Sequence, residues 1–197
     1  MKTINNKKNL GKISCITMVA MTCAGLTGCG TKAEDVMKPL KDGKYEEAAS
    51  KYNEAEWSDK EKEEFKKQIN DYLSQIVTDY AAENITYEEA RDIVGTISDM
   101  QINNMDEDIA VASGSLSTLK ASKTAYKNGI IQMEKENYIG AMEYFEAVIE
   151  TDINYEDANK KLVEAGTLQY NKIKEEMLAE AENFIKNTDY KSAFDLI

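Results

Sequence analysis

Apolar side chains recur along most of the chain at spacings of three and four residues, the period at which one face of an α-helix repeats. The longest regular runs lie within 58–82 and 155–186. Their apolar positions are Phe65, Ile69, Leu73, Ile76 and Tyr80 in the first run, and Ile173, Met177, Ala181, Phe184 and Ile185 in the second. No alternation of strands with helices accompanies them, so the sequence predicts an all-α protein.

Capping and turn residues divide this pattern into separate helices. Ser58 with Glu61 fits the capping box that starts a helix, and Thr86 opens the next helix. Asp42-Gly43 predicts a tight turn, and the SGS at 113–115 predicts a break. The predicted helices are 33–41, 44–56, 58–82, 86–101, a short one starting near 105, 117–135, 137–151 and 155–186.

One short pattern of residues occurs four times and begins a helix each time. A tyrosine is followed by an alanine three residues later, on the same helical face. The copies start with Tyr45 and Ala48, Tyr87 and Ala90, Tyr138 and Ala141, and Tyr190 and Ala193. The ring can fill the gap beside a partner helix, while the alanine lets two helix axes approach closely. We therefore expect these tyrosines and alanines to pack between the two helices of repeated helix pairs. A row of tyrosines that stacks on a carbohydrate or peptide is the less favoured alternative.

The best copy, residues 125–158, resembles the tetratricopeptide repeat, a pair of antiparallel helices that stacks into a solenoid. Its matching positions are Gly129 in the first helix, Tyr138 and Ala141 in the second, and Tyr155 with Ala158 opening the helix that follows. Successive tyrosines of the four copies are 42, 51 and 52 residues apart, against about 34 in the family. The resemblance implies an irregular solenoid of helix pairs over residues 35–197.

The sequence stops at SAFDLI, residues 192–197, in the middle of a predicted helix. A solenoid normally ends in a helix with a polar outer face, and none is visible here. Two explanations follow. The helical domain is truncated at its C-terminal end, or another subunit or partner covers the open end; the first is favoured.

The N-terminal residues have the pattern of a secretory signal. Lys2, Lys7, Lys8 and Lys12 precede residues 13–26, which carry no charge and end in small residues. A helix that spans a bilayer needs about 20 apolar residues, and this run is too short and too rich in Ser and Thr. We therefore expect a targeting segment instead of a permanent span.

The four residues at the end of this segment, Leu26-Thr27-Gly28-Cys29, resemble the lipobox of bacterial lipoproteins. The resemblance implies that a signal peptidase recognises Leu26, Thr27 and Gly28, cleaves before Cys29, and leaves a diacylglyceryl lipid on that cysteine. Residues 1–28 are then a cleaved signal peptide, and residues 29–34 are the lipid anchor and a short tether. Two acyl chains on one residue hold a protein at a membrane far more firmly than one chain does. An ordinary cleaved signal with an incidental cysteine is the alternative.

Charge and composition narrow the possible partners. The chain has 24 basic and 36 acidic residues, and the four lysines before Cys29 leave with the signal, so the mature part has 20 against 36, a net charge of −16. Such a surface excludes nucleic acid as a partner. The chain has no histidine, which removes the commonest general base and metal ligand.

Three short motifs have simpler explanations than the chemistry they suggest. The DED at 106–108 lacks the glycine and glutamate of a calcium loop, so it fits a helix start. The STLK at 117–120 matches the Ser-x-x-Lys of penicillin-recognising enzymes without their other motifs. The NIT at 84–86 matches a glycosylation acceptor, which a bacterial lipoprotein would seldom use. We assign no catalytic residue, no metal ligand and no cofactor apart from the lipid on Cys29.

These observations predict a non-enzymatic lipoprotein at the cell membrane, facing the extracytoplasmic side, whose helical repeats bind a protein or peptide. The alternative is the helical segment of a larger envelope lipoprotein, a foldase or cell-wall enzyme, with its active domain beyond residue 197. A solute-binding lipoprotein ranks last, because such binders usually have two α/β lobes.

Overall fold

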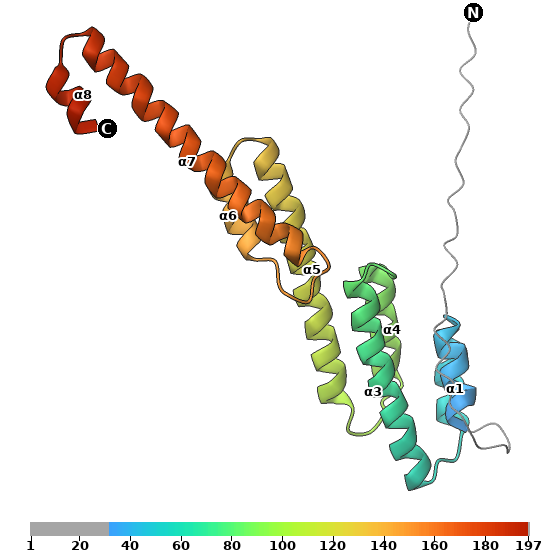
Figure 1. The fold of residues 1–197 in the computed structure, drawn as a ribbon. Coiled ribbons are helices and arrows are strands. Elements are labelled where there is room, and N and C mark those ends of the chain that lie inside the picture. Colours follow the sequence, from blue (N-terminus) through green and yellow to red (C-terminus); the bar gives the residue numbers. More distant parts are fainter. Residues whose placement is uncertain (1–31, 197) are drawn as a thin grey trace, which may run out of the picture. The chain divides into compact units, whose positions relative to one another are not determined.

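The computed structural model describes residues 32–196, and this part of the chain is all-α, as predicted, with eight helices and no strand. The helices are α1 Lys32–Lys41, α2 Tyr45–Glu54, α3 Asp59–Ala81, α4 Tyr87–Asp99, α5 Asp106–Glu134, α6 Tyr138–Glu146, α7 Tyr155–Lys186 and α8 Tyr190–Leu196 (Figure 1). The predicted signal peptide and the lipobox residues Leu26, Thr27, Gly28 and Cys29 lie outside the described residues. Helix α1 begins at Lys32, within the predicted tether 29–34.

Reciprocal capping starts two of the helices where the sequence predicted a start. The Ser58 N–H donates to Glu61 Oε2 at 2.8 Å, and the Glu61 N–H donates to Ser58 Oγ at 3.4 Å. Thr86 and Glu89 make the same two bonds at the start of α4, at 2.7 and 3.2 Å. The hydroxyl and N–H of Ser58 lower the pKa of Glu61 to about 2. Each box satisfies N–H groups that would otherwise lack partners at a helix end.

The first helix of each pair ends in the same type of turn. After α1, α3, α5 and α7, one residue adopts a left-handed conformation, and the next N–H bonds back to a carbonyl five residues earlier. The left-handed residues are Gly43, Glu83, Glu136 and Thr188, with φ of 74°, 62°, 56° and 63°. The returning bonds join Lys44 N to Pro39 O, Asn84 N to Asp79 O, Asn137 N to Gln132 O, and Asp189 N to Phe184 O, at 2.8–3.0 Å. This turn folds each following helix back along its predecessor.

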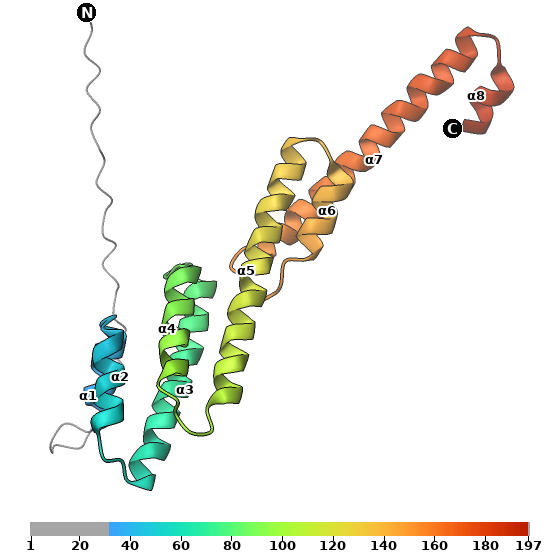
Figure 2. The ribbon, with the colours of Figure 1, turned by 180° about the vertical axis from the view of Figure 1, so that it is seen from behind.

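Consecutive helices therefore pack as pairs: α1 with α2, α3 with α4, α5 with α6, and α7 with α8 (Figures 1 and 2). The alanine of the repeated pattern is buried in all four copies, at Ala48, Ala90, Ala141 and Ala193, and so is Ala158 at the start of α7. Tyr45, Tyr87, Tyr138 and Tyr155 are partly buried against the cores. Tyr190 is 66% exposed, so the prediction that it packs between helices is wrong. Within the described residues α8 packs mainly on α7, and it turns Ala193 inward.

The predicted break at 113–115 is also wrong, because α5 runs through it without interruption. The predicted separate helices near 105 and over 117–135 are one helix. Ser115 bonds back to the Val111 carbonyl at 2.9 Å, and Thr118 bonds to the Gly114 carbonyl at 3.0 Å. Ala112 and Leu116 on the other face are buried in the core. Tertiary packing here outweighs the low helix propensity of Ser and Gly.

Helix α6 ends at Glu146 and does not reach the predicted residue 151. The chain turns away because the Ile149 N–H donates to Ser122 Oγ of α5, at 3.1 Å. The following residues to 154 form the connection to α7, whose bounds agree with the predicted 155–186.

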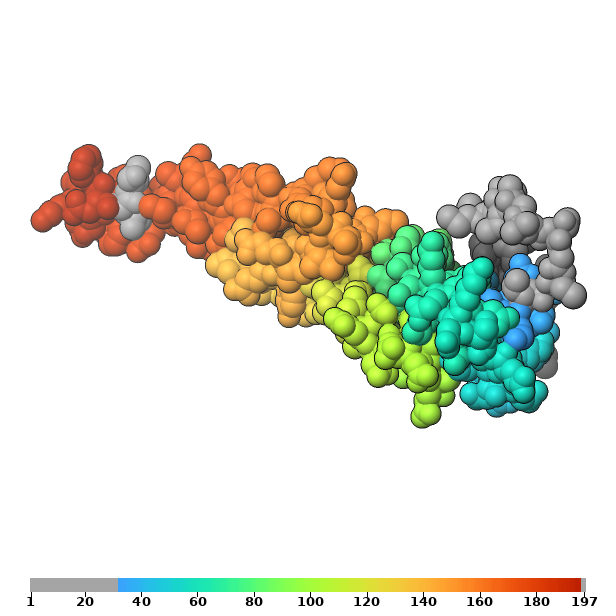
Figure 3. Space-filling view, turned by 90° about the horizontal axis from the view of Figure 1, so that it is seen from below, coloured from blue at the N-terminus to red at the C-terminus, as the bar shows by residue number. Residues whose placement is uncertain are grey.

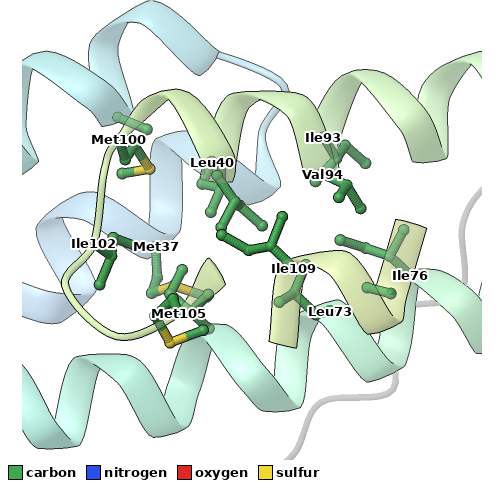
Figure 4. Packing of buried hydrophobic residues seen from close by; sticks show 14 of the residues in the cluster. Met37, Leu40, Leu73, Ile76, Ile93, Val94, Met100, Ile102, Met105 and Ile109 are labelled. Carbon is green, nitrogen blue, oxygen red and sulfur yellow. The ribbon is translucent and has the colours of Figure 1, made fainter. Parts of the chain in front are cut away.

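Two apolar cores hold these helices together. The larger core joins α1–α4 to the first half of α5, ending at Leu119. Figure 4 shows its centre, where the labelled side chains are Met37, Leu40, Leu73, Ile76, Ile93, Val94, Met100, Ile102, Met105 and Ile109. The smaller core begins at Ala125 and joins the second half of α5 to α6 and the start of α7. Helix α5 is thus common to both cores.

Candidate functional site

Polar residues separate the two cores on α5. Ser122 and Lys123 lie between Leu119, the last α5 residue of the larger core, and Ala125, the first of the smaller core. Both are buried, with 1% and 8% of their surfaces exposed, and so is Asp152 of the α6–α7 connection, at 3%. We call these three residues the polar junction.

Hydrogen bonds connect the polar junction to three segments of the chain. Ser122 Oγ donates to Asp152 Oδ2 at 2.7 Å. Lys123 Nζ donates to the Ala81 carbonyl and to Glu83 Oε1, both at 3.0 Å, and lies 3.6 Å from Asp152 Oδ1. The junction therefore ties the α3–α4 turn, α5 and the α6–α7 connection to one another.

Asp152 remains ionised in this buried position. Burial alone raises its pKa, but hydrogen bonds from the N–H and amide of Asn154 and from Ser122, with the Lys123 charge, outweigh burial and place the pKa below its usual value. The two Asn154 bonds are both 3.0 Å long. No buried side-chain polar atom of the described residues lacks a hydrogen-bond partner. A lysine and a carboxylate with all their partners filled have a structural role, so we assign no catalysis to them.

A second feature is a stripe of uncovered apolar side chains on α7. Tyr170, Ile173, Met177 and Leu178 are 66%, 45%, 37% and 44% exposed. Their spacing places them on one side of the helix. We call these four residues the α7 stripe. Farther along, Ile185 of α7 and Tyr190 and Phe194 of α8 are exposed as well.

The α7 stripe is uncovered because other helices contact α7 only near its ends. Helix α6 packs against the first part of α7, where Ala158 and Ala165 are buried, and α8 covers Ala181 near the end. Every residue from 170 to 180 is exposed. On the face shown in Figure 3, no other helix lies over this part of α7. This part of α7 therefore lacks the packing that normally stabilises a helix. An isolated helical segment of about three turns is only marginally stable in water.

Glutamates line both edges of the stripe. Glu176 and Glu180 follow Ile173 at three and seven residues, and Glu175 and Glu182 lie one turn before and after Leu178. None of them forms an ion pair with another described residue. Lys174 lies within the stripe. Apart from Lys174, the surface is therefore apolar along its middle and acidic along its edges.

A surface hollow of about 240 Å³ lies among α2, α3 and the connection after α4. Its walls are mostly charged or amide side chains, including Lys62, Lys66 and Asn104. The apolar residues Phe65 and Ile102 are almost completely buried beneath it. The hollow therefore offers a ligand little apolar surface.

The described residues contain no group of three or more side chains suited to hold a metal ion. Asp106 and Asp108 lie in the first turn of α5, and Lys120 lies in the middle of α5, where its Nζ sits 3.8 Å from the ring centre of Tyr87. Within residues 32–196, each helix is too short or too polar to cross a bilayer.

The sequence pattern identified the apolar phase of α7 but not its exposure. Ile173 and Met177 recur at the period of a buried face, and only the placement of α6 and α8 shows that nothing covers them. Asp152 lies within the best repeat, residues 125–158, but its pairing with α5 has no sequence signature. The chain matches no known protein family model, no curated protein and no solved structure.

Proposed function

We propose that this protein is a non-catalytic scaffold, anchored to the cell membrane by a lipid on Cys29, that binds a protein or peptide outside the cytoplasm. The observation that carries the binding role is the α7 stripe, an apolar surface uncovered along about three helical turns. Exposed apolar patches of this kind are typical of interaction sites.

The helix pairs are divergent tetratricopeptide-like repeats in this proposal. Two features support it: the buried alanine one turn after each tyrosine, and the same left-handed turn between the two helices of every pair. Stacked helix pairs of this type commonly present side chains to protein partners.

Replacing Cys29 with serine tests the anchor. Because a hydroxyl cannot replace the thiol as the lipid acceptor, the C29S variant should either leave the membrane fraction or remain unprocessed, without the lipid mass. Membrane fractionation with intact-mass spectrometry measures both outcomes, and Cys23→Ser is the matched control, since Cys23 lies within the segment that is removed. Unchanged mass and fractionation of C29S would refute lipidation.

Site-specific photocrosslinking in intact cells tests the binding role. A photoreactive amino acid at Tyr170 or Met177 should give one discrete adduct, while the same group at Lys172, on the opposite side of α7, should not. The partner identified by mass spectrometry should bind the purified full chain, and the double change Ile173→Ser and Met177→Ser should weaken this binding at least about tenfold. Equal adducts from all three positions, or none from the stripe, would contradict a binding role for this surface.

A further inference from the structure

Assuming the proposed function, we propose that the α7 stripe binds an amphipathic helix whose apolar face is flanked by lysine or arginine. The shape, hydrogen bonding and charge of the stripe each lead to one part of this assignment.

The shape of the stripe fits a helix. Tyr170, Ile173 and Met177 follow each other at three and four residues along α7, which is the arrangement of side-chain ridges that pack into the grooves of another helix. An amphipathic helix laid on such a surface presents its own side chains at the same period.

Backbone hydrogen bonding disfavours an extended peptide. All N–H and C=O groups in the middle of α7 are used within the helix, so α7 offers no edge to which a strand could add. An extended peptide lying on apolar side chains would bury backbone groups without partners, and each such group costs free energy. A helical ligand satisfies its own backbone and avoids this cost.

Charge identifies the flanks of the ligand. Glu176 and Glu180 on one edge, and Glu175 and Glu182 on the other, are exposed and have no ion-pair partner among the described residues. A ligand helix with basic residues beside its apolar face places opposite charges next to both edges. The chain as a whole carries a net charge of −12, which further favours a basic ligand.

The same charges argue against a second copy of this chain as the occupant. Two stripes facing each other would bring together edges that both carry glutamates, and like charges across an interface are destabilising. The stripe contributes only about three turns, which is little area for a stable dimer.

Three synthetic helical peptides test the proposal on the purified full chain. The first has a leucine and alanine face flanked by lysine, the second replaces every lysine with glutamate, and the third scrambles the first so that it has no apolar face. In fluorescence anisotropy titrations, we expect the lysine-flanked peptide to bind at least about tenfold more tightly than either of the others.

Variants on the surface separate the contributions of apolar and charged groups. The double change Ile173→Ser and Met177→Ser should weaken binding of the lysine-flanked peptide at least about tenfold. The double change Glu176→Gln and Glu180→Gln should weaken it by about two- to fivefold, with less dependence on salt. The matched control is Val111→Ser, an exposed apolar residue on α5 at 63% exposure, which should leave binding unchanged. Circular dichroism checks that each variant remains folded.

Each contrary result identifies which proposal fails. The glutamate-flanked peptide could bind as tightly as the lysine-flanked peptide, with this binding lost in the Ile173 and Met177 variant. That result overturns the basic ligand and leaves the scaffold role intact. Equal binding of the scrambled peptide shows simple charge attraction and overturns the assignment. No binding of any peptide, together with a dimer in analytical ultracentrifugation that the Ile173 and Met177 variant abolishes, overturns both this assignment and the proposed function.

Discussion

Replacing Asp152 with alanine should lower the free energy of unfolding by about 2–3 kcal/mol, because it removes the buried anion beside the Lys123 ammonium, which keeps only Glu83 Oε1 and the Ala81 carbonyl at 3.0 Å. The same change removes the acceptor for the Ser122 hydroxyl and for both Asn154 donors. Urea unfolding followed by circular dichroism measures this loss. A decrease below about 1 kcal/mol would show that water enters the polar junction and replaces the carboxylate.

A double-mutant cycle isolates the ion pair from the other bonds of Asp152. Lys123→Met keeps the length of the side chain but removes its charge, and its combination with Asp152→Ala should cost less than the sum of the two single changes. The matched control is Asp157→Ala. Asp157 also accepts a hydrogen bond from an α5 residue, Tyr126, but in an exposed position. That control should cost much less than Asp152→Ala, since solvent can replace an exposed partner.

The same carboxylate gives the protein a defined response to acid. The pKa of Asp152 is lower in the folded chain than its usual value, so its stabilising contribution is complete above the unfolded pKa of about 3.9. The contribution is lost as the pH falls through the lower, folded pKa. Glu61, with a pKa of about 2, acts in the same direction. We expect unfolding free energy to vary little with pH from 5 to 8, to fall below about pH 4, and to fall less steeply in Asp152→Ala.

Local sequence signals predicted the all-α class and the starts of most helices. Ser58 and Thr86 each start a helix where their capping pattern indicated, because capping depends on residues only three apart. The repeated tyrosine and alanine found the second helix of every pair for a similar reason, since both residues lie on one turn. The bounds of α7 also followed from its apolar period.

Features that depend on distant contacts could not be predicted in this way. Helix α5 continues through Gly114 because Ala112 and Leu116 are held in a core built mainly by other helices. Lys123 and Asp152 are 29 residues apart and meet only after α6 has folded back on α5. The α7 stripe has the sequence pattern of a buried face, and its exposure depends on where α6 and α8 lie. The turn residues Glu83, Glu136 and Thr188 are equally difficult to predict, since glycine is the usual choice there.

The two glycines of α5 should respond in opposite ways to the same substitution. Gly114→Ala adds a methyl group to a position with no heavy atom within 4 Å, so it should stabilise the protein by about 0.5–1 kcal/mol through helix propensity. At Gly129 the added carbon would lie 2.5, 2.7 and 2.9 Å from three ring atoms of Phe145, which is only 2% exposed, so the ring or a helix must shift.

Because both substitutions lie within one helix, their propensity gain cancels in the comparison, and the difference between them measures the clash with Phe145. We expect Gly129→Ala to be less stable than Gly114→Ala by about 1–3 kcal/mol in urea unfolding, the usual cost of overpacking a core. Phe145→Leu in the Gly129→Ala background should recover part of this loss, because the smaller side chain makes room for the methyl group. Equal stability of the two alanine variants would contradict the close packing of Phe145 on Gly129, because it would mean that α5 and α6 separate at little cost.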